Sequence, residues 1–460
     1  MDRERHGLRA VPFAVVRPAV LAFLSSECYN IGQEKQTVRR QKGNYMISKP
    51  RGTMDIMPEE TPLWQHIEKT VRETASKYGY EEIRTPTFES TELFARGVGD
   101  STDVVQKEMY TFEDREHRSF TLRPEGTASV VRALIENGRC SDAMPLRLYY
   151  LISCFRYEKP QAGRSREFFQ FGTEMFGSSD PSADATVISL ANEIIGSLGI
   201  TDVGLHINSI GCPECRPGYR KALVEYFTDY SGELCESCRE RLKTNPLRIL
   251  DCKSPVCSEI AKKAPKMIDY LCGECKDHFE SLTEYLSSMG IRYEIDPYIV
   301  RGLDYYTRTV FEFISGGIGA QSTVCGGGRY DGLMKELGGP DLPGIGFAMG
   351  LTRLILAMKA SGAEMPASAV PAVYFCTMGK EAVKYALSQV AVLREKGIFA
   401  DCDIVGRSVK SQMKYADKIK ARYAVVIGDN ELQTGKAVLK DMILGSSREV
   451  GLKELWKEFV

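Results

Sequence analysis

The chain has 460 residues, enough for two or three domains, and its 43% hydrophobic and 26% charged content is typical of a soluble globular protein. A formal net charge of −1 excludes a globally basic nucleic-acid-binding protein, so any such site must come from a local patch. No uninterrupted apolar run reaches transmembrane length, and we expect a cytoplasmic protein without a membrane partner.

Residues 1–45 begin with a charged segment, continue into an apolar stretch broken by Arg17 and Pro18, and end in a polar, basic stretch. The apolar stretch faintly resembles a signal peptide, so a targeting segment is one alternative. We interpret 1–45 as a disordered extension or as a start assigned too early. The sequence MISKPRGTMDIMP, from Met46, has the character of a natural beginning.

Apolar residues at helical spacing predict three early helices, over 62–78, 128–135 and 183–198. The segment 81–90, EEIRTPTFES, has strand character limited by a proline. The two runs 146–158 and 166–177 are rich in β-forming residues and flank a short Gly/Arg loop. They predict an antiparallel hairpin.

Residues from about 205 to 295 are Cys-rich and charged, which indicates an insertion within a larger domain spanning 46–367. After this insertion the chain returns to strand character, and Gly326–Gly328 predict a tight turn. A buried strand running into an apolar helix follows over 345–359. A loop-like boundary then leads to 368–460, where short strands alternate with helices and predict a separate α/β domain.

The stretch FRYEKPQAGRSREFFQFGTE carries the densest set of polar groups. Arg156 and Glu158, two apart on the expected strand, should share a face, as should Gln170 and Glu174 on the returning strand. Arg164 in the loop adds a second guanidinium, a group that binds carboxylate or phosphate in bidentate fashion. This arrangement suits a small zwitterion and a phosphate, whereas the alternative is a surface hairpin with ordinary salt bridges.

Three further stretches could complete such a site. RPEGT places Glu125 and Thr127 at a strand-to-helix junction, where Glu could accept an ammonium group and Thr could cap the helix. RGLDYY contains Tyr305 and Tyr306, which should point to opposite faces of a strand. GIGFAMGLTR places Arg353 just inside a helix N-terminus, a position that favours phosphate. A helix start, strand packing and a paired arginine are the respective alternatives.

Together these stretches resemble the class II aminoacyl-tRNA synthetases, and among them the histidyl-tRNA synthetase family. FRYEKPQAGRSREFFQFGTEMFG is similar to the second class motif, GIGFAMGLTRLIL to the third, and PTFESTELFARGVG to the first, which lies at the dimer interface in that class. RGLDYYTRTVFEF and GGGRYDGL resemble two stretches peculiar to the family. The resemblance begins near Lys49 and implies an α+β catalytic domain on an antiparallel six-stranded sheet, an anticodon-binding domain and a homodimer.

The resemblance also implies an activity, the ATP-dependent ligation of L-histidine to tRNA(His) through a histidyl-adenylate, with Mg²⁺ as cofactor. It assigns catalysis to Arg156 and Arg301. The histidine-binding residues that it implies are Glu125, Gly126, Thr127, Arg156, Gln170, Glu174, Arg301, Tyr305, Tyr306 and Tyr330. The ATP-binding residues that it implies are Arg156, Glu158, Arg164 and Arg353. A substrate carboxylate is already a nucleophile, so fixed arginines can suffice. This agrees with five histidines that lack triad or metal spacing.

A basic segment in the C-terminal domain is the candidate tRNA surface. Lys410, Lys414 and Lys418 recur every four residues and therefore share one face of a predicted helix. Such a face suits contacts with RNA phosphates, and the alternative is a helix face that is exposed to solvent and binds nothing.

Eight of the fourteen cysteines lie between Cys212 and Cys275. Two CxxC pairs separated by 19 residues have zinc-ribbon spacing, and they predict a structural Zn²⁺ held by Cys212, Cys215, Cys235 and Cys238. A second, less regular set consists of Cys252, Cys257, Cys272 and Cys275. The alternative is a group of reduced thiols without metal.

Two other functions fit part of the pattern. One is a catalytically silent, synthetase-like regulatory subunit of ATP phosphoribosyltransferase, and the other is an RNA-binding or stress-sensing module. The regulatory subunits generally lack the anticodon-binding domain and the full RGLDYY stretch. Because this chain has both, we prefer the enzyme.

Overall fold

The structure is a computed structural model that describes residues 47–99, 102–161, 163–250, 252, 254–299 and 303–459. The predicted extension 1–45 and the predicted catalytic residue Arg301 lie outside the described residues. Within the described residues, no helix combines the length and apolar character needed to cross a bilayer.

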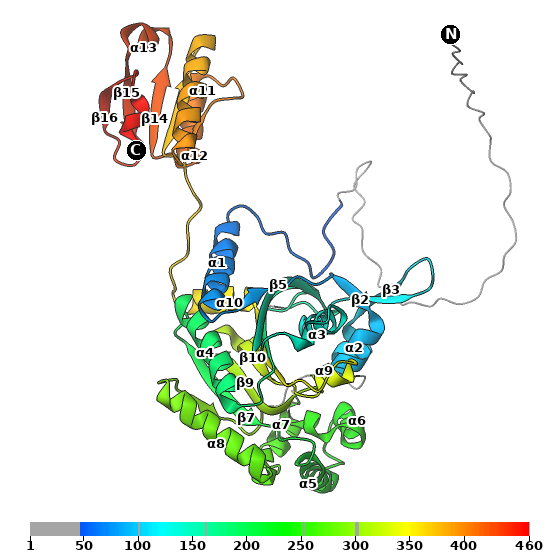
Figure 1. Ribbon diagram of the computed structural model, residues 1–460. Coiled ribbons are helices and arrows are strands. Elements are labelled where there is room, and N and C mark those ends of the chain that lie inside the picture. The colour runs from blue at the N-terminus through cyan, green and yellow to red at the C-terminus, as the bar shows by residue number, and fades with distance from the viewer. Residues whose placement is uncertain are drawn as a thin grey trace, which may run out of the picture. The chain divides into compact units, whose positions relative to one another are not determined.

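An eight-stranded sheet forms the centre of the first part of the chain, in the order β1-β5-β6-β11-β10-β9-β7-β8 (Figure 1). The strands are β1 (Glu81–Glu82), β5 (Leu146–Phe155), β6 (Glu167–Phe176), β7 (Val203–Ser209), β8 (Glu294–Ile295), β9 (Thr307–Ser315), β10 (Thr323–Arg329) and β11 (Gly344–Gly350). β5 and β6 pair antiparallel over ten residues, which confirms the predicted hairpin.

The expected six-stranded antiparallel sheet is wrong in strand number and in the pairing at both edges. The six central strands, from β5 to β7, do pair antiparallel. β1, however, pairs parallel with β5, and β8 pairs parallel with β7. Each edge strand has two residues, too few to show an alternating hydrophobic pattern in the sequence.

Two layers of helices cover the sheet. On one face pack α1 (Thr61–Lys77), α4 (Pro181–Ser197), α8 (Gly273–Ser288) and α10 (Leu351–Ala360). On the other face pack α3 (Thr127–Glu136) and α9 (Leu333–Glu336). The three predicted helices correspond to α1, α3 and α4. In α1 the buried Ile67, Val71 and Ala75 share one side, as their spacing predicts.

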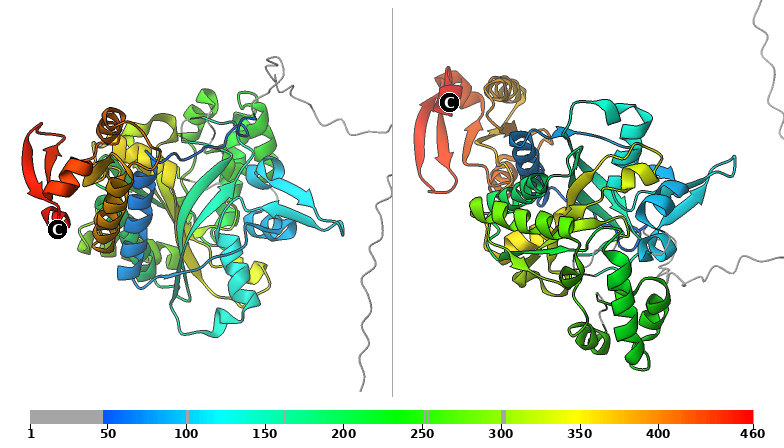
Figure 2. Two further views of the ribbon diagram at one scale, coloured as in Figure 1. Left: turned by 90° about the horizontal axis from the view of Figure 1, so that it is seen from above. Right: turned by 60° about the horizontal axis from the view of Figure 1, so that its bottom comes forward.

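A small second sheet carries the stretch that resembles the first class motif. It has the order β2-β4-β3, with β2 (Phe88–Ser90), β3 (Tyr110–Glu113) and β4 (Ser119–Leu122), and α2 (Thr91–Val98) follows β2 directly. The β3–β4 hairpin extends away from the main sheet (Figure 2). Pro86 separates β1 from β2, so the expected single strand over 81–90 is two short strands.

The Cys-rich segment folds into short helices with a core of their own. These are α5 (Arg216–Asp229), α6 (Glu236–Thr244) and α7 (Pro255–Ala261), and they gather beside the β7 end of the sheet (Figure 1). Their common core contains Leu223, Phe227 and Ile249 together with buried cysteines.

The glycines Gly326–Gly328 lie inside β10, so the predicted tight turn is wrong. A Cβ on Gly327 would approach the Gly346 carbonyl oxygen to 2.3 Å, and one on Gly328 would approach the Thr309 carbonyl oxygen to 2.5 Å. These glycines therefore permit close contact between strands.

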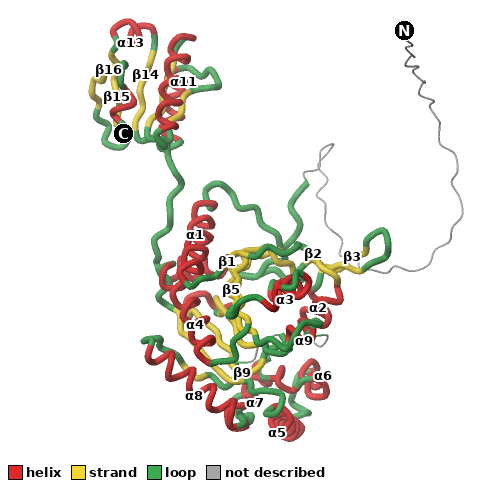
Figure 3. Tube along the Cα trace, viewed as in Figure 1, coloured by secondary structure: helices red, strands yellow, loops and turns green. Residues whose placement is uncertain are grey.

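The last part of the chain is an α/β unit, as predicted. Its sheet has the order β13-β12-β14-β15-β16, formed by β12 (Val373–Thr377), β13 (Ala400–Cys402), β14 (Tyr423–Ile427), β15 (Lys436–Asp441) and β16 (Ser447–Gly451). Its helices are α11 (Lys380–Glu395), α12 (Val409–Lys418) and α13 (Asp429–Thr434). The segment between α10 and β12 is a loop (Figure 3), which agrees with the predicted boundary.

Candidate active site

A cavity of about 480 Å³ is lined by the β5–β6 hairpin, by parts of β9 and β10, and by the start of α10. Five predicted site residues line this cavity: Arg156, Glu158, Arg164, Gln170 and Arg353. Three of them are arginines, and the cavity is therefore suited to an anion such as a polyphosphate.

Arg156 and Glu158 lie just beyond the end of β5 and not on the strand as expected. The Arg156 amide still donates to the Arg166 carbonyl at 2.8 Å, and the Glu158 amide then donates to the Arg156 carbonyl at 2.8 Å in a tight turn. The Arg156 guanidinium Nε donates to the Pro124 carbonyl at 2.9 Å and lies 5.4 Å from the centre of the Phe168 ring. Arg156 is therefore fixed by a backbone contact and an aromatic ring.

The second and third cavity arginines are held from different directions. Arg164 Nε lies 3.1 Å from a carboxylate oxygen of Glu158. Arg353 is in the first turn of α10, where its guanidinium donates to the Thr323 carbonyl at 2.8 Å and the Gly163 carbonyl at 3.3 Å. The arginine and the helix N-terminus both favour negative charge at this end of the cavity.

A buried hydrogen-bonded cluster centres on Glu174 of β6. Its carboxylate accepts hydrogen bonds from Thr127 Oγ1 at 2.7 Å, from the Tyr150 hydroxyl at 3.2 Å, and from the Tyr330 hydroxyl. Gln170, four residues earlier on the same face of β6, lines the cavity. The cluster is therefore tied to the cavity through one strand.

Glu125 has a structural partner within the cluster. Its carboxylate oxygens accept from the amides of Thr127 at 2.7 Å and Ala128 at 2.9 Å, so it caps the N-terminus of α3. Each oxygen keeps a further lone pair, which leaves capacity to accept an ammonium group.

Burial controls the protonation of both glutamates. It raises the pKa of Glu174 from 4.5 to about 8, although the hydrogen bonds from Tyr330 and Thr127 act in the opposite direction. Burial also raises the pKa of Glu125, against the hydrogen bonds from the Ala128 and Thr127 amides. A neutral Glu174 could donate a hydrogen bond as well as accept one.

Tyr305 and Tyr306 precede β9, so the expectation that they alternate across a strand is wrong. Their rings lie side by side with centroids 4.7 Å apart, and Tyr305 also contacts the Tyr330 ring at 5.7 Å. Outside a strand, adjacent side chains need not point to opposite faces.

Tyr150 is a member of the Glu174 cluster that the sequence did not identify. Its ring fills space left by two glycines, since a Cβ on Gly126 or Gly172 would lie within 2.5 Å of it. Tyr150 pairs with Gly172 across the hairpin, and the neighbouring Leu148 on the same face pairs with Glu174. The hairpin register is the signal that could have located it.

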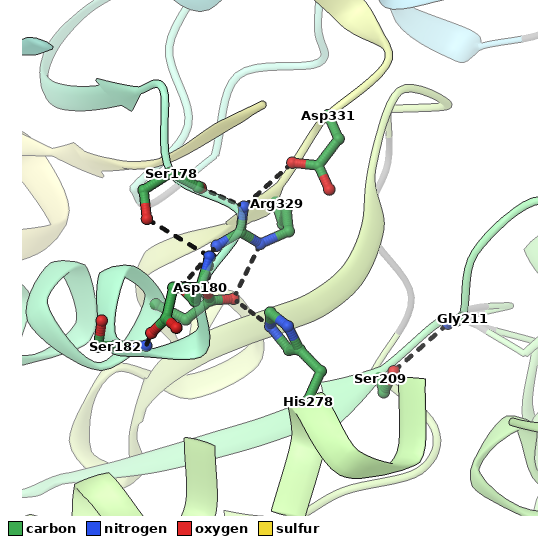
Figure 4. A network of polar contacts seen from close by, with 9 residues as sticks. Ser178, Asp180, Ser182, Ser209, Gly211, His278, Arg329 and Asp331 are labelled. Carbon is green, nitrogen blue, oxygen red and sulfur yellow. Dashed lines mark hydrogen bonds and ion pairs between the residues drawn. The ribbon is translucent and has the colours of Figure 1, made fainter. Parts of the chain in front are cut away.

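A buried ion pair beside the cluster joins several elements (Figure 4). Arg329, at the end of β10, is fully buried and pairs with the carboxylate of Asp184 in α4, which also contacts His278 Nε2 at 3.2 Å. Arg329 further donates to the Ser178 carbonyl at 2.8 Å and contacts Asp331 at 3.1 Å. Burial alone would raise the pKa of Asp184, but Arg329 and His278 hold it below its usual value. This network fixes the start of the Tyr330 segment.

In the C-terminal unit, α12 exposes Lys410, Lys414 and Lys418 and buries Gln412 and Ala416. The three lysines therefore share an exposed helix face, as predicted. Their contact with tRNA remains a prediction.

The predicted set of four zinc ligands is wrong in its pairing. The thiols form two groups, Cys212 with Cys215, Cys272 and Cys275, and Cys235 with Cys238, Cys252 and Cys257. In each group the four sulfur atoms lie within 4.8 Å of one another. The two CxxC pairs that were expected to share an ion lie in different groups, because the fold brings each one to cysteines farther along the chain.

Three features define a class II aminoacyl-tRNA synthetase: a hairpin that carries Arg156, a strand-to-helix junction that carries Arg353, and a central antiparallel sheet. The chain belongs to the histidyl-tRNA synthetase family, whose model matches residues 52–214 and 240–354. A model described as an anticodon binding domain matches residues 372–460. The family model does not match residues 215–239, within the Cys-rich segment.

Individual relatives agree with this assignment. A histidine–tRNA ligase from Acetivibrio thermocellus is 52% identical over 406 residues, which cover 88% of this chain and 97% of the relative. The crystal structure of apo S. aureus histidyl-tRNA synthetase is 41% identical with a TM-score of 0.76, covering 90% of this chain and 100% of that chain. A Bacillus halodurans structure described as an ATP phosphoribosyltransferase regulatory subunit/histidyl-tRNA synthetase is 22% identical with a TM-score of 0.58, a likeness of fold alone. The match covers 84% of this chain and 99% of that chain.

Proposed function

We propose that the chain ligates L-histidine to tRNA(His) in two steps, with histidyl-adenylate as the intermediate and AMP and pyrophosphate as products. The observation that carries this proposal is the arginine-lined cavity joined through β6 to the buried Glu174 cluster, in a chain of this family. The cavity suits the ATP phosphates, and the cluster suits a small polar side chain.

In the first step, the histidine carboxylate attacks the α-phosphorus of ATP, and the bond to pyrophosphate breaks. Two anions must approach, so fixed positive charge lowers the barrier. Arg156 holds the carboxylate and the α-phosphate, and Arg301 has the second catalytic role. Glu125, Gly126, Thr127 and Gln170 hold the amino group, while Glu174, Tyr305, Tyr306 and Tyr330 enclose the imidazole.

ATP binds through Arg156, Glu158, Arg164 and Arg353. Mg²⁺ bound with the nucleotide would neutralise phosphate charge, and it takes oxygen ligands. The cavity lining includes the carboxylates of Glu158, Asp296 and Glu312, which are oxygen donors of the kind that this ion takes. In the second step the terminal ribose hydroxyl of the tRNA attacks the carbonyl carbon of the adenylate, and the bond to AMP breaks.

The chain divides into a catalytic domain over 46–367 and an anticodon-binding domain over 368–460. The predicted Cys-rich insertion at about 205–295 includes β7 and β8 of the main sheet, and the part with its own core is the segment of α5, α6 and α7. The exposed lysine face of α12 supports this proposal because a basic face suits contacts with tRNA phosphates. We place the enzyme in the cytoplasm, where tRNA and ATP are present and thiols stay reduced.

The active form in this proposal is a homodimer. Phe88 and Phe112 are 49% and 43% exposed and, with Phe120, form an aromatic patch on the small sheet. Exposed aromatic patches of this kind mark protein interfaces. Phe88 lies on the stretch that resembles the dimer-forming class motif, and Phe112 and Phe120 lie on the paired strands β3 and β4 of the same small sheet.

Structural Zn²⁺ in the Cys-rich insertion completes the proposed cofactors. Groups of four thiols match the ligand number of structural zinc sites and leave no position open for catalysis.

ATP–pyrophosphate exchange tests the proposed function. Exchange should depend on histidine and should be absent with other amino acids. Arg301→Ala should abolish the exchange while circular dichroism remains that of the unaltered chain. Exchange without histidine dependence would contradict the proposal, and a chain with no exchange would instead fit the regulatory-subunit alternative.

A further inference from the structure

We infer that the insertion holds two separate tetrathiolate Zn²⁺ sites, and that one of them positions the tyrosine segment of the histidine pocket. Site A consists of Cys212, Cys215, Cys272 and Cys275, and site B of Cys235, Cys238, Cys252 and Cys257. The positioning role of site A rests on the proposed function, whereas the two metal sites do not.

The sulfur geometry agrees with tetrahedral zinc. A Zn–S bond of about 2.3 Å places tetrahedral sulfurs about 3.8 Å apart. In site A the Cys212 sulfur lies 3.6 Å from that of Cys215 and 3.8 Å from that of Cys272. In site B the sulfurs of Cys235 and Cys252 are 3.8 Å apart.

Backbone amides support the sulfurs at both sites. The Cys272 amide donates to the Cys215 sulfur at 3.1 Å, and the Cys235 amide donates to the Cys257 sulfur at 3.2 Å. Hydrogen bonds of this type stabilise a thiolate, the form in which cysteine binds metal.

The alternative is a core in which the cysteines pack as small apolar side chains. The insertion core is small, and its large buried apolar side chains are Tyr219, Leu223, Phe227, Leu234, Ile249, Leu250, Ile260 and Met267. The three α-helices around it have 14, 9 and 7 residues. Small cores of this kind usually need metal ions or disulfides. Apolar packing of the cysteine side chains also gives no reason why the eight thiols should form two groups of four.

Site A is joined directly to the segment that follows Tyr305 and Tyr306. Gly211, next to Cys212, accepts from the Arg308 amide at 2.9 Å and from Thr307 Oγ1 at 3.1 Å. Arg308 has a φ of 51°, a left-handed conformation that is costly for a residue with a Cβ and must be held by its surroundings.

Residues next to the other ligands of site A contact the same segment. Arg216, next to Cys215, donates to the Tyr306 carbonyl. Glu274, between Cys272 and Cys275, lies 3.4 Å from the Arg308 guanidinium. Two neighbours of site A ligands, Gly211 and Arg216, thus contact the backbone at 306–308, and a third, Glu274, contacts the Arg308 side chain.

Site B is connected to the tyrosine segment less directly than site A is. Arg248, four residues before Cys252, contacts Asp304 at 3.3 Å, and Arg241, three residues after Cys238, contacts Asp103 at 3.2 Å. Both contacts involve long side chains that are several residues away from a thiol. Loss of site B should therefore disturb the tyrosine segment less than loss of site A.

Metal analysis of the full chain, loaded with Zn²⁺ and then desalted, tests the two sites. We expect two equivalents of zinc per unaltered chain and about one equivalent in Cys272→Ser and in Cys252→Ser. These two variants are matched because each replaces a half-buried cysteine, one in site A and one in site B. Cys140→Ser, outside both groups, is the control and should retain two. Cobalt should show the visible absorption of tetrahedral thiolate coordination. Less than about half an equivalent of zinc in the unaltered chain would overturn both sites.

Exchange kinetics test the positioning role. Cys272→Ser should raise KM for histidine about tenfold while KM for ATP stays within about twofold, and Cys252→Ser should change neither appreciably. Because Cys272→Ser could unfold the insertion, Glu274→Gln serves as a second variant that keeps all eight thiols. It should keep two zinc ions and still raise KM for histidine. Equal effects of the two cysteine variants, or an unchanged KM in Glu274→Gln, would overturn the positioning role. Two zinc ions in a chain without exchange would leave the metal sites standing and contradict the proposed function.

Discussion

The hydroxyl of Thr127 donates a 2.7 Å hydrogen bond to the carboxylate of Glu174, which joins the first residue of α3 to the C-terminal half of β6. This bond connects the junction that should hold the amino group with the carboxylate that should read the imidazole. The proposed histidine pocket is therefore one hydrogen-bonded unit, and altering one member should affect the others.

Tyr330→Phe removes one of the three donors to Glu174 while keeping the ring. We expect KM for histidine in pyrophosphate exchange to rise about tenfold, the effect of losing one hydrogen bond to a charged or buried group. KM for ATP should stay unchanged. Tyr374→Phe, at a buried tyrosine of the C-terminal unit, is the matched control and should alter neither constant. A parallel rise in both constants would indicate general damage to the fold.

Glu174 should make stability depend on pH. Its pKa of about 8 in the folded chain lies above its ordinary value of 4.5, so between these values the folded state holds a proton that the unfolded state releases. The free energy of unfolding should therefore fall as pH rises from about 4.5 to 8, by up to about 1.4 kcal/mol per unit, and level off above pH 8. In Glu174→Gln the midpoint of urea unfolding should change less with pH across this range than in the unaltered chain. The exposed Glu364→Gln should retain the slope of the unaltered chain, and equal slopes in all three would contradict the prediction.

The buried pair of Arg329 and Asp184 should be essential for stability. Arg329→Met leaves a buried carboxylate without its guanidinium partner, and we expect a loss of about 3–5 kcal/mol in urea unfolding. Lys436→Met breaks an exposed pair with Glu449 and should cost less than about 1 kcal/mol. If the two variants lost similar stability, the assigned importance of the buried network would be incorrect.

Charge reversal on α12 should separate tRNA binding from amino-acid activation. Lys410→Glu with Lys414→Glu places negative charge on the exposed face, so we expect at least tenfold weaker tRNA binding at moderate salt. Pyrophosphate exchange, which needs no tRNA, should stay within twofold of the unaltered chain. Loss of both activities together would count against a tRNA role for this face.

The aromatic patch predicts the effect of a charge on assembly. Phe88→Asp should shift the chain from dimer to monomer in sedimentation velocity, since a carboxylate cannot be buried unpaired against apolar rings. Val370→Asp, at an exposed apolar residue of the loop before β12, should leave the dimer intact. A monomeric unaltered chain would contradict the proposed homodimer.

The hydrophobic periodicity of the sequence and the order of its motifs predicted much of the secondary structure and the domain organisation. The helices α1, α3 and α4, the β5–β6 hairpin and the C-terminal α/β unit all followed from local patterns, because each contains a long run with one period. The two-residue strands β1 and β8 did not follow, since strands that short carry no period. The sequence of Gly326–Gly328 predicted a turn, but these glycines allow neighbouring strands to approach closely. The atoms that they approach belong to Gly346 and Thr309, which are not neighbours in the sequence, so local patterns could not indicate this role.

The sequence by itself determined which chemistry is present: arginines and glutamates for a zwitterion and a polyphosphate, a basic helix face, and eight clustered thiols. The tertiary structure decided which residues meet. It joined Glu174 to Thr127, Tyr150 and Tyr330, placed Tyr305 beside Tyr306, and divided the thiols into two groups that differ from the spacing-based set. The physical reason is that strand register and helix packing join Glu174 to residues 24 to 156 positions away, and separations of this size leave no trace in local spacing.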